Sequence, residues 1–136
     1  MKNKFLFLFG VFFFSITLLS EYSNDIKIKS GTIEFIKESN KINFLNNVEV
    51  DSDFVKIIAE SAIYDDTNSV ISLEGRPSLI KSNKKDNTFD GKAEKILFFN
   101  DQKVHLIGNA SMQYENISIS SNLIVFNPQT GKISSD

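Results

Sequence analysis

The chain has 136 residues, with 15 Lys and Arg against 17 Asp and Glu, and no Cys. The length indicates a single domain. The slightly acidic balance argues against nucleic acid or an anionic membrane surface as a partner, since both select clustered Lys and Arg, and the absence of Cys excludes disulfides and thiol chemistry.

The N-terminal stretch MKNKFLFLFGVFFFSITLLS differs from the rest of the chain. Two Lys precede an apolar run from Phe5 to Leu19, and the small residue Ser20 follows, which is the layout of a secretory signal peptide over residues 1–20. As a helix this run would reach only about 22 Å, against roughly 30 Å of hydrocarbon in a bilayer. An uncleaved membrane anchor stays open as the alternative, because the residue two before Ser20 is not small. Either way, residues 21–136 are expected to be exported to a periplasm.

Beyond the N-terminal stretch, short β-branched and aromatic runs alternate with clusters of Asn, Asp, Gly, Ser and Lys. Within the runs, apolar residues recur at every second position, which is typical of half-buried antiparallel strands. The clearest alternations are Ile26/Ile28, Ile33/Phe35, Ile42/Phe44, Val48/Val50, Ala110/Met112/Tyr114 and Ile117/Ile119. The pattern predicts an all-β fold.

One strand–turn–strand pattern occurs three times, at intervals of 28 to 34 residues. Its turn recurs as LNNVEV, EGRPSL and IGNASM, which places residues of easy positive φ at one equivalent position: Asn46, Gly75 and Gly108. Its second strand recurs as AESAIY, AEKILF and SNLIVF. Within each copy the inward-facing parity switches from odd to even, which requires an extra residue, so a β-bulge is expected to bend every strand at the same place.

Bent strands of this kind predict an elongated, twisted β-jelly roll, that is, a roll of repeated antiparallel strands whose two curved sheets face each other. Small residues are expected to leave width between the sheets: Ala59, Gly91, Ala93 and Ala110. The edge strands are expected near Ile26–Ile36 and Asn122–Ile133, where unpaired edges would invite another chain to add a strand.

Few residues could carry chemistry. His105 is the only His and, without Cys, cannot form the usual zinc site, so it is expected at the surface or in a strand pair. The acidic pairs Asp51/Asp53 and Asp65/Asp66 fall in turn-like clusters, with a calcium ligand set or a catalytic dyad as the alternative. The basic cluster KSNKKDN is interpreted as a solvated hairpin loop, with contact to ligand phosphates as the alternative. Because nucleophile and phosphate-loop motifs are absent, we expect no enzyme, no metal and no cofactor.

Several short stretches resemble, in order along residues 26–136, the OstA-like domain family: NNV, AESAIYD, ISLEGRPSLI and GNA. This family includes the periplasmic lipopolysaccharide-transport bridge protein LptA, its membrane-anchored neighbour LptC and the N-terminal part of LptD. The resemblance implies a twisted β-jelly roll that holds lipopolysaccharide acyl chains in an apolar groove. It also implies domains that stack end to end by edge pairing, with no bond made or broken.

On this resemblance, the chain is expected to be a periplasmic lipopolysaccharide-binding transport protein, non-enzymatic, that passes lipid toward the outer membrane. The expected partners are the lipid A acyl chains of lipopolysaccharide, LptC-like and LptD-like OstA domains of the bridge, and further copies in an end-to-end homo-oligomer. The alternatives are an LptC-like membrane-anchored component and a structural β-repeat protein with a sealed core. Strand parity selects the inward residues that are expected to bind lipid: Phe44, Val48, Val50, Ile57, Ala59, Tyr64, Leu73, Leu79, Ala93, Phe98, Leu106, Met112, Ile117, Ile119 and Phe126.

Overall fold

The structure, a computed structural model, describes residues 14–18, 26–85 and 88–135. These residues form one antiparallel sheet of ten strands and a short 3-10 helix, η2 (Lys37–Ser39). The strands are β1 (Phe14–Leu18), β2 (Ile26–Ser30), β3 (Thr32–Ile36), β4 (Lys41–Asp51), β5 (Val55–Asp65), β6 (Val70–Ser82), β7 (Phe89–Phe99), β8 (Val104–Tyr114), β9 (Ile117–Asn127) and β10 (Lys132–Ser135). The predicted all-β fold is confirmed.

Most of the predicted signal peptide lies outside the described residues. Its residues Phe14–Leu18 form β1, whose backbone pairs antiparallel with β2. Within the described ranges, no helix has the length and apolar character needed to span a membrane.

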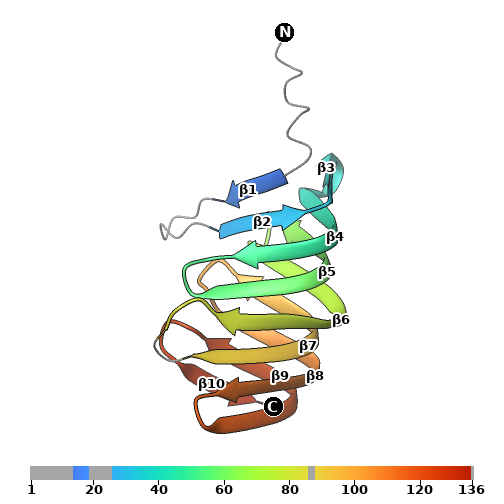
Figure 1. Cartoon of the computed structure of the whole chain (residues 1–136). Helices are drawn as coiled ribbons and strands as arrows, with labels where there is room; N and C mark the ends of the chain where they lie inside the picture. Colours follow the sequence, from blue (N-terminus) through green and yellow to red (C-terminus); the bar gives the residue numbers. More distant parts are fainter. Residues whose placement is uncertain (1–13, 19–25, 86–87, 136) are drawn as a thin grey trace.

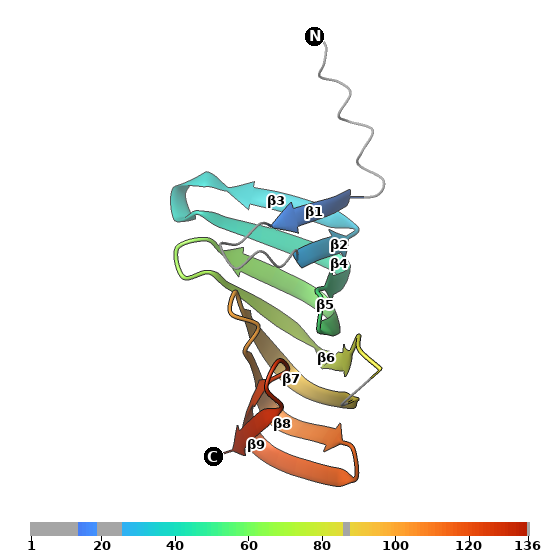
Figure 2. The same ribbon diagram turned by 90° about the vertical axis from the view of Figure 1, so that its left-hand side faces the viewer.

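The strands stack almost in chain order, from β1 at one end to β10 at the other (Figure 1). β3 leaves this order because it pairs with β4, as β2 does. β2 and β3 are therefore the two parts of one bent strand, interrupted at Gly31, whose N–H donates to the Asn46 carbonyl at 2.9 Å. The stack twists between its two ends (Figure 2), as sheets of L-residues do.

Each long strand bends at a β-bulge near its middle. The ladder skips Asn46 and Asn47 in β4, and Gly108 and Asn109 in β8, and all four residues have positive φ. Asn and Gly enter this region at the lowest steric cost, so the predicted positive φ at Asn46 and Gly108 is confirmed, although both residues lie at bulges inside strands and not in turns between strands. Gly75 differs from the prediction: its φ is not positive, and the stretch that β6 skips, residues 75–77, is one residue longer.

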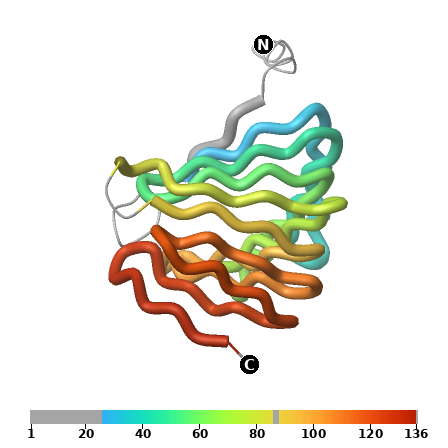
Figure 3. Tube along the Cα trace, turned by 60° about the horizontal axis from the view of Figure 1, so that its bottom comes forward, coloured from blue at the N-terminus to red at the C-terminus, as the bar shows by residue number. Residues whose placement is uncertain are grey.

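The bends divide the sheet into two halves, which lie over each other as two layers (Figure 3). Half A consists of β3, β10 and residues 41–45, 61–65, 70–74, 95–99, 104–107 and 123–127. Half B consists of β1, β2 and residues 48–51, 55–59, 78–82, 89–93, 110–114 and 117–121. We call the line of bulges the corner, and the opposite side, where strand ends and turns of the two halves meet, the mouth.

The inner faces of the two halves share one hydrophobic core. Gly91 of half B illustrates how close they come, since a Cβ atom added there would lie 3.3 Å from Leu106 Cδ1 of half A. The small residues predicted to set the width between the sheets lie in this core: Ala59, Ala93 and Ala110 are all buried. The predicted roll of repeated antiparallel strands is therefore confirmed.

The edges of the sheet differ in part from the prediction. In half A they are β3 and β10, close to the predicted ranges. In half B of the full chain, β1 pairs along the outer side of β2, so β2 is the edge only in a form that lacks residues 1–20. At the other end, β10 pairs only with residues 124–127 of β9. The half-B part of β9 therefore pairs with β8 alone among the described strands and forms the edge there.

Candidate functional site

The interior between the two halves contains most of the residues predicted to bind lipid. These eleven are buried there: Phe44, Val48, Val50, Ile57, Ala59, Leu73, Ala93, Phe98, Leu106, Met112 and Phe126. Tyr64 and Ile119 are half-buried and pack against the same core. The structure thus brings thirteen of the fifteen residues together on one apolar surface that both halves share.

The inward position predicted for Leu79 is wrong. It is 45% exposed on the outer face of half B, and its neighbour Ile80 is the buried, inward residue. The reason is the bulge of β6, which skips three residues where those of β4 and β8 skip two, so the inward parity changes between Leu73 and Ile80. Ile117 pairs with Tyr114 at the mouth and is 57% exposed, since it lies at the start of an edge strand.

Aromatic side chains close the mouth. Phe126 of half A contacts Phe89 of half B edge to face, with ring centroids 4.5 Å apart, and Tyr114 of half B at 5.9 Å. Gly131, in the turn after β9, lies against the same Tyr114, because an added Cβ would be 2.8 Å from the tyrosine hydroxyl. Such ring pairs contribute about 0.5–1.5 kcal/mol each beyond the area they bury, so they hold the halves together without a covalent link.

One polar contact also crosses the mouth. The Ser52 hydroxyl, in the turn between β4 and β5, lies 3.2 Å from Gln102 Oε1, in the turn between β7 and β8. Gln102 is 1% exposed and has a positive φ of 75°. Its Nε2 is enclosed and has no hydrogen-bond partner among the described residues. The mouth therefore contains a buried amide donor beside an apolar interior.

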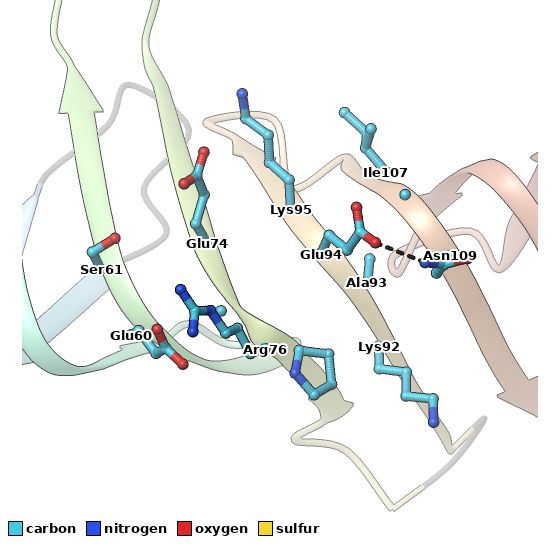
Figure 4. A pocket seen from close by; sticks show the side chains of 13 residues that line it. Glu60, Ser61, Glu74, Arg76, Lys92, Ala93, Glu94, Lys95, Ile107 and Asn109 are labelled. Atoms are coloured by element: carbon cyan, nitrogen blue, oxygen red, sulfur yellow. Dashed lines mark hydrogen bonds between the residues drawn. The ribbon is translucent and has the colours of Figure 1, made fainter.

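A cavity of about 860 Å³ lies along the corner (Figure 4). Its charged lining consists of three acids and three bases: Glu60, Glu74, Glu94, Arg76, Lys92 and Lys95. Asn109 donates to Glu94 Oε2 at 2.7 Å, and Gly108 leaves room for that carboxylate, since a Cβ there would lie 2.6 Å from Glu94 Oε1. The three negative and three positive charges of this lining balance.

The outer face of half B carries a further depression of about 590 Å³. Ile58 and Leu79, cross-strand neighbours, form its exposed apolar part, and three Lys surround them: Lys56, Lys81 and Lys92. Lys56 pairs with Glu49 at 3.2 Å, and this contact raises its pKa. Nothing in the structure shows what would cover this patch.

His105 is half-buried and lies in a strand pair, which is one of the two locations predicted for it. Its ring contacts Phe99 at 4.8 Å, and burial, reinforced by Lys103, lowers its pKa. The imidazole is therefore neutral at neutral pH and has no carboxylate hydrogen-bonded to it among the described contacts.

The acidic pairs lie where strands pass into turns, since Asp51 and Asp65 end β4 and β5 and Asp53 and Asp66 follow in the turns. Asp65 accepts hydrogen bonds from the backbone and side chain of Asn68, and the side-chain bond lowers its pKa. Asp51 accepts from Asn83 at 2.7 Å. Among residues 14–18, 26–85 and 88–135, no group of three or more His, Cys, Asp or Glu could hold a metal ion.

The basic cluster at residues 81–87 is described up to Lys85. Asn83 ties this loop to the turn after β4 by donating to the Ser52 carbonyl at 2.9 Å, and Lys84 lies 5.3 Å from the Phe54 ring centroid. In the described part, the loop therefore braces the half-B side of the mouth.

Sequence reasoning missed the polar residues of the mouth. Ser52 and Gln102 both follow strands in polar turn sequences, and such residues are ordinarily solvated. The one local signal at Gln102 is its place in a short Asn-Asp-Gln turn, which does not distinguish an enclosed side chain from an exposed one.

Comparisons with known proteins agree with the fold. The family model described as "LptA/(LptD N-terminal domain) LPS transport protein" matches residues 27–132. No curated protein matches the sequence. The structure is similar to the crystal structure of LptH, described as the LptA homologous periplasmic component of the conserved lipopolysaccharide transport device from Pseudomonas aeruginosa. The TM-score is 0.71 at 16% identity over 81% of this chain and 80% of that one, which is a likeness of fold.

Proposed function

The chain belongs to the family of LptA and LptD N-terminal lipopolysaccharide-transport proteins, and on this premise we propose that it shelters the acyl chains of lipopolysaccharide in the interior between its two halves. It acts in the periplasm, without catalysis or a cofactor, and passes the lipid toward the outer membrane. The observation that carries this proposal is the single apolar surface that both inner faces share.

Lipid entry requires the halves to separate at the mouth, because the inner residues are buried in the closed roll. The described side-chain contacts that would break there are few: the rings of Phe89 and Tyr114 against Phe126, and the bond between Ser52 and Gln102. In return, each buried methylene of an acyl chain gains about 0.8 kcal/mol, so ten of them gain about 8 kcal/mol. Separating the inner faces also exposes core side chains, at the same free-energy cost per unit of apolar area, so the acyl chain replaces core contacts with contacts of the same kind.

The edges of the sheet support end-to-end stacking. Half A has eight strands, from β3 to β10, and each is antiparallel to its neighbours. If a second copy continues the stack in the same orientation, its β3 runs antiparallel to the first copy's β10. Such a joint uses ordinary antiparallel pairing, and LptC-like and LptD-like domains would join in the same way.

Lipopolysaccharide binding is the direct test. The exported protein is expected to bind lipopolysaccharide saturably, with one molecule per domain, and to release an apolar dye as it does so. A sealed structural β-repeat protein would show no saturable uptake of either. The mass of the exported protein distinguishes the LptA-like form, which loses residues 1–20, from the anchored LptC-like form, which keeps them.

A further inference from the structure

Gln102 has three properties that a turn residue does not ordinarily combine. It is 1% exposed, its φ of 75° is one that L-residues other than Gly, Asn and Asp seldom adopt, and its Nε2 is buried without a partner among the described residues. More than nine in ten buried polar groups in proteins are hydrogen-bonded, so an unpaired amide donor beside an apolar interior requires an explanation.

Ser52 fixes which atom of the amide is unpaired. The serine oxygen already accepts from two backbone N–H groups, those of Phe54 at 3.4 Å and Val55 at 3.3 Å. Its own hydrogen is therefore available to donate, and Gln102 Oε1 at 3.2 Å is a closer acceptor than the Val55 carbonyl at 3.5 Å. Gln102 presents its oxygen to Ser52, and Nε2 is left for another acceptor.

The surroundings of Gln102 Nε2 favour one kind of acceptor. A phosphate or carboxylate would have to bring a negative charge into an enclosed site whose described donor, the amide of Gln102, is neutral, which is costly. A water molecule needs two to four polar partners, and among the described residues Gln102 Nε2 is the one buried side-chain nitrogen or oxygen at the mouth that has no partner. A neutral carbonyl oxygen at the head of an apolar chain satisfies both the donor and its surroundings.

On the basis of the proposed function, we propose that Gln102 donates a hydrogen bond from Nε2 to the ester or amide carbonyl that joins an acyl chain to its headgroup. The headgroup then lies at the mouth and the chain lies between the two halves. Gln102 is a specificity-determining residue in this arrangement, because it distinguishes acyl chains from alkyl chains of the same length.

The test compares two lipids that differ only in this carbonyl: short-chain diacyl phosphatidylglycerol and its dialkyl ether counterpart, titrated calorimetrically into the full exported protein. We expect the unmodified protein to bind the ester lipid roughly tenfold more tightly than the ether lipid, the value of one buried neutral hydrogen bond. Gln102→Met keeps the shape of the side chain and removes the donor, so it is expected to lower ester-lipid affinity to that of the ether lipid and to leave ether-lipid affinity unchanged.

Gln113→Met is the matched control, since Gln113 is exposed on half B and bonds to the Glu115 carbonyl. It is expected to keep the tenfold preference. Equal affinities in the unmodified protein, or a preference that survives Gln102→Met, would overturn the inference. The first of these results needs no variant, so a folding failure of Gln102→Met leaves the test intact. If lipopolysaccharide itself binds while the carbonyl makes no difference, the inference fails and the proposed function stands.

Discussion

Bridging the mouth is expected to abolish lipid uptake. Ser52→Cys combined with Gln102→Cys places one thiol on each side, at positions whose native side chains lie 3.2 Å apart, in a chain that has no other Cys. A short linker with two thiol-alkylating groups then prevents the two halves from separating. Because an acyl chain can reach the buried inner faces only after they separate, we expect the bridged protein to bind lipopolysaccharide at least tenfold more weakly than the unbridged double variant, a difference of about 1.4 kcal/mol or more.

The order of addition supplies the control. The unbridged double variant carries the same two substitutions, including the loss of the Gln102 donor, and is therefore the reference against which the further loss caused by bridging is measured. Protein that is loaded first and bridged afterwards is expected to retain its lipid against a chase of empty acceptor vesicles. Unchanged uptake by the bridged protein would show that lipid enters elsewhere, for example from the end of the stack.

Phe126→Ala is expected to lower the free energy of unfolding by about 3–5 kcal/mol, the usual cost of truncating a buried Phe. Phe126 is 1% exposed and contacts both Phe89 and Tyr114 across the mouth. The loss is a large part of the total, because domains of this size are stable by only about 5–15 kcal/mol. Denaturant unfolding of the exported protein measures it.

Phe126→Leu is the matched comparison. It keeps an apolar side chain in the core and removes the ring contacts, so its cost is expected to lie well below that of Phe126→Ala. If Phe126→Ala costs less than about 1 kcal/mol, the ring does not join the two halves in solution, and the closed mouth described above is wrong.

Local patterns account for much of the fold. Period-2 alternation predicts the strands because half of each strand's side chains enter one shared core. The recurring turn predicts the bends at Asn46 and Gly108 because few residues adopt positive φ easily. The alternation also predicts which residues face the core, wherever a bulge has the same length as in the other copies of the repeat.

Three features could not be predicted from local patterns. Leu79 was placed inward because the alignment treats the bulge of β6 as equal to those of β4 and β8, and the added residue is visible only in the ladder. The contact between Ser52 and Gln102 joins residues fifty positions apart, and no local pattern records such a pair. The pairing of Phe14–Leu18 with β2 was missed because an apolar leader sequence is read as a targeting signal.

Site-specific photocrosslinking in cells tests the central claim most directly. The probe is placed at Ile119, which packs against the shared core, and at Ile58 or Leu79, which are about as apolar and lie on the outer face of half B. An interior that carries lipid predicts that lipopolysaccharide is recovered from position 119 and not from 58 and 79. Recovery from the outer pair alone, or equally from both, would contradict it.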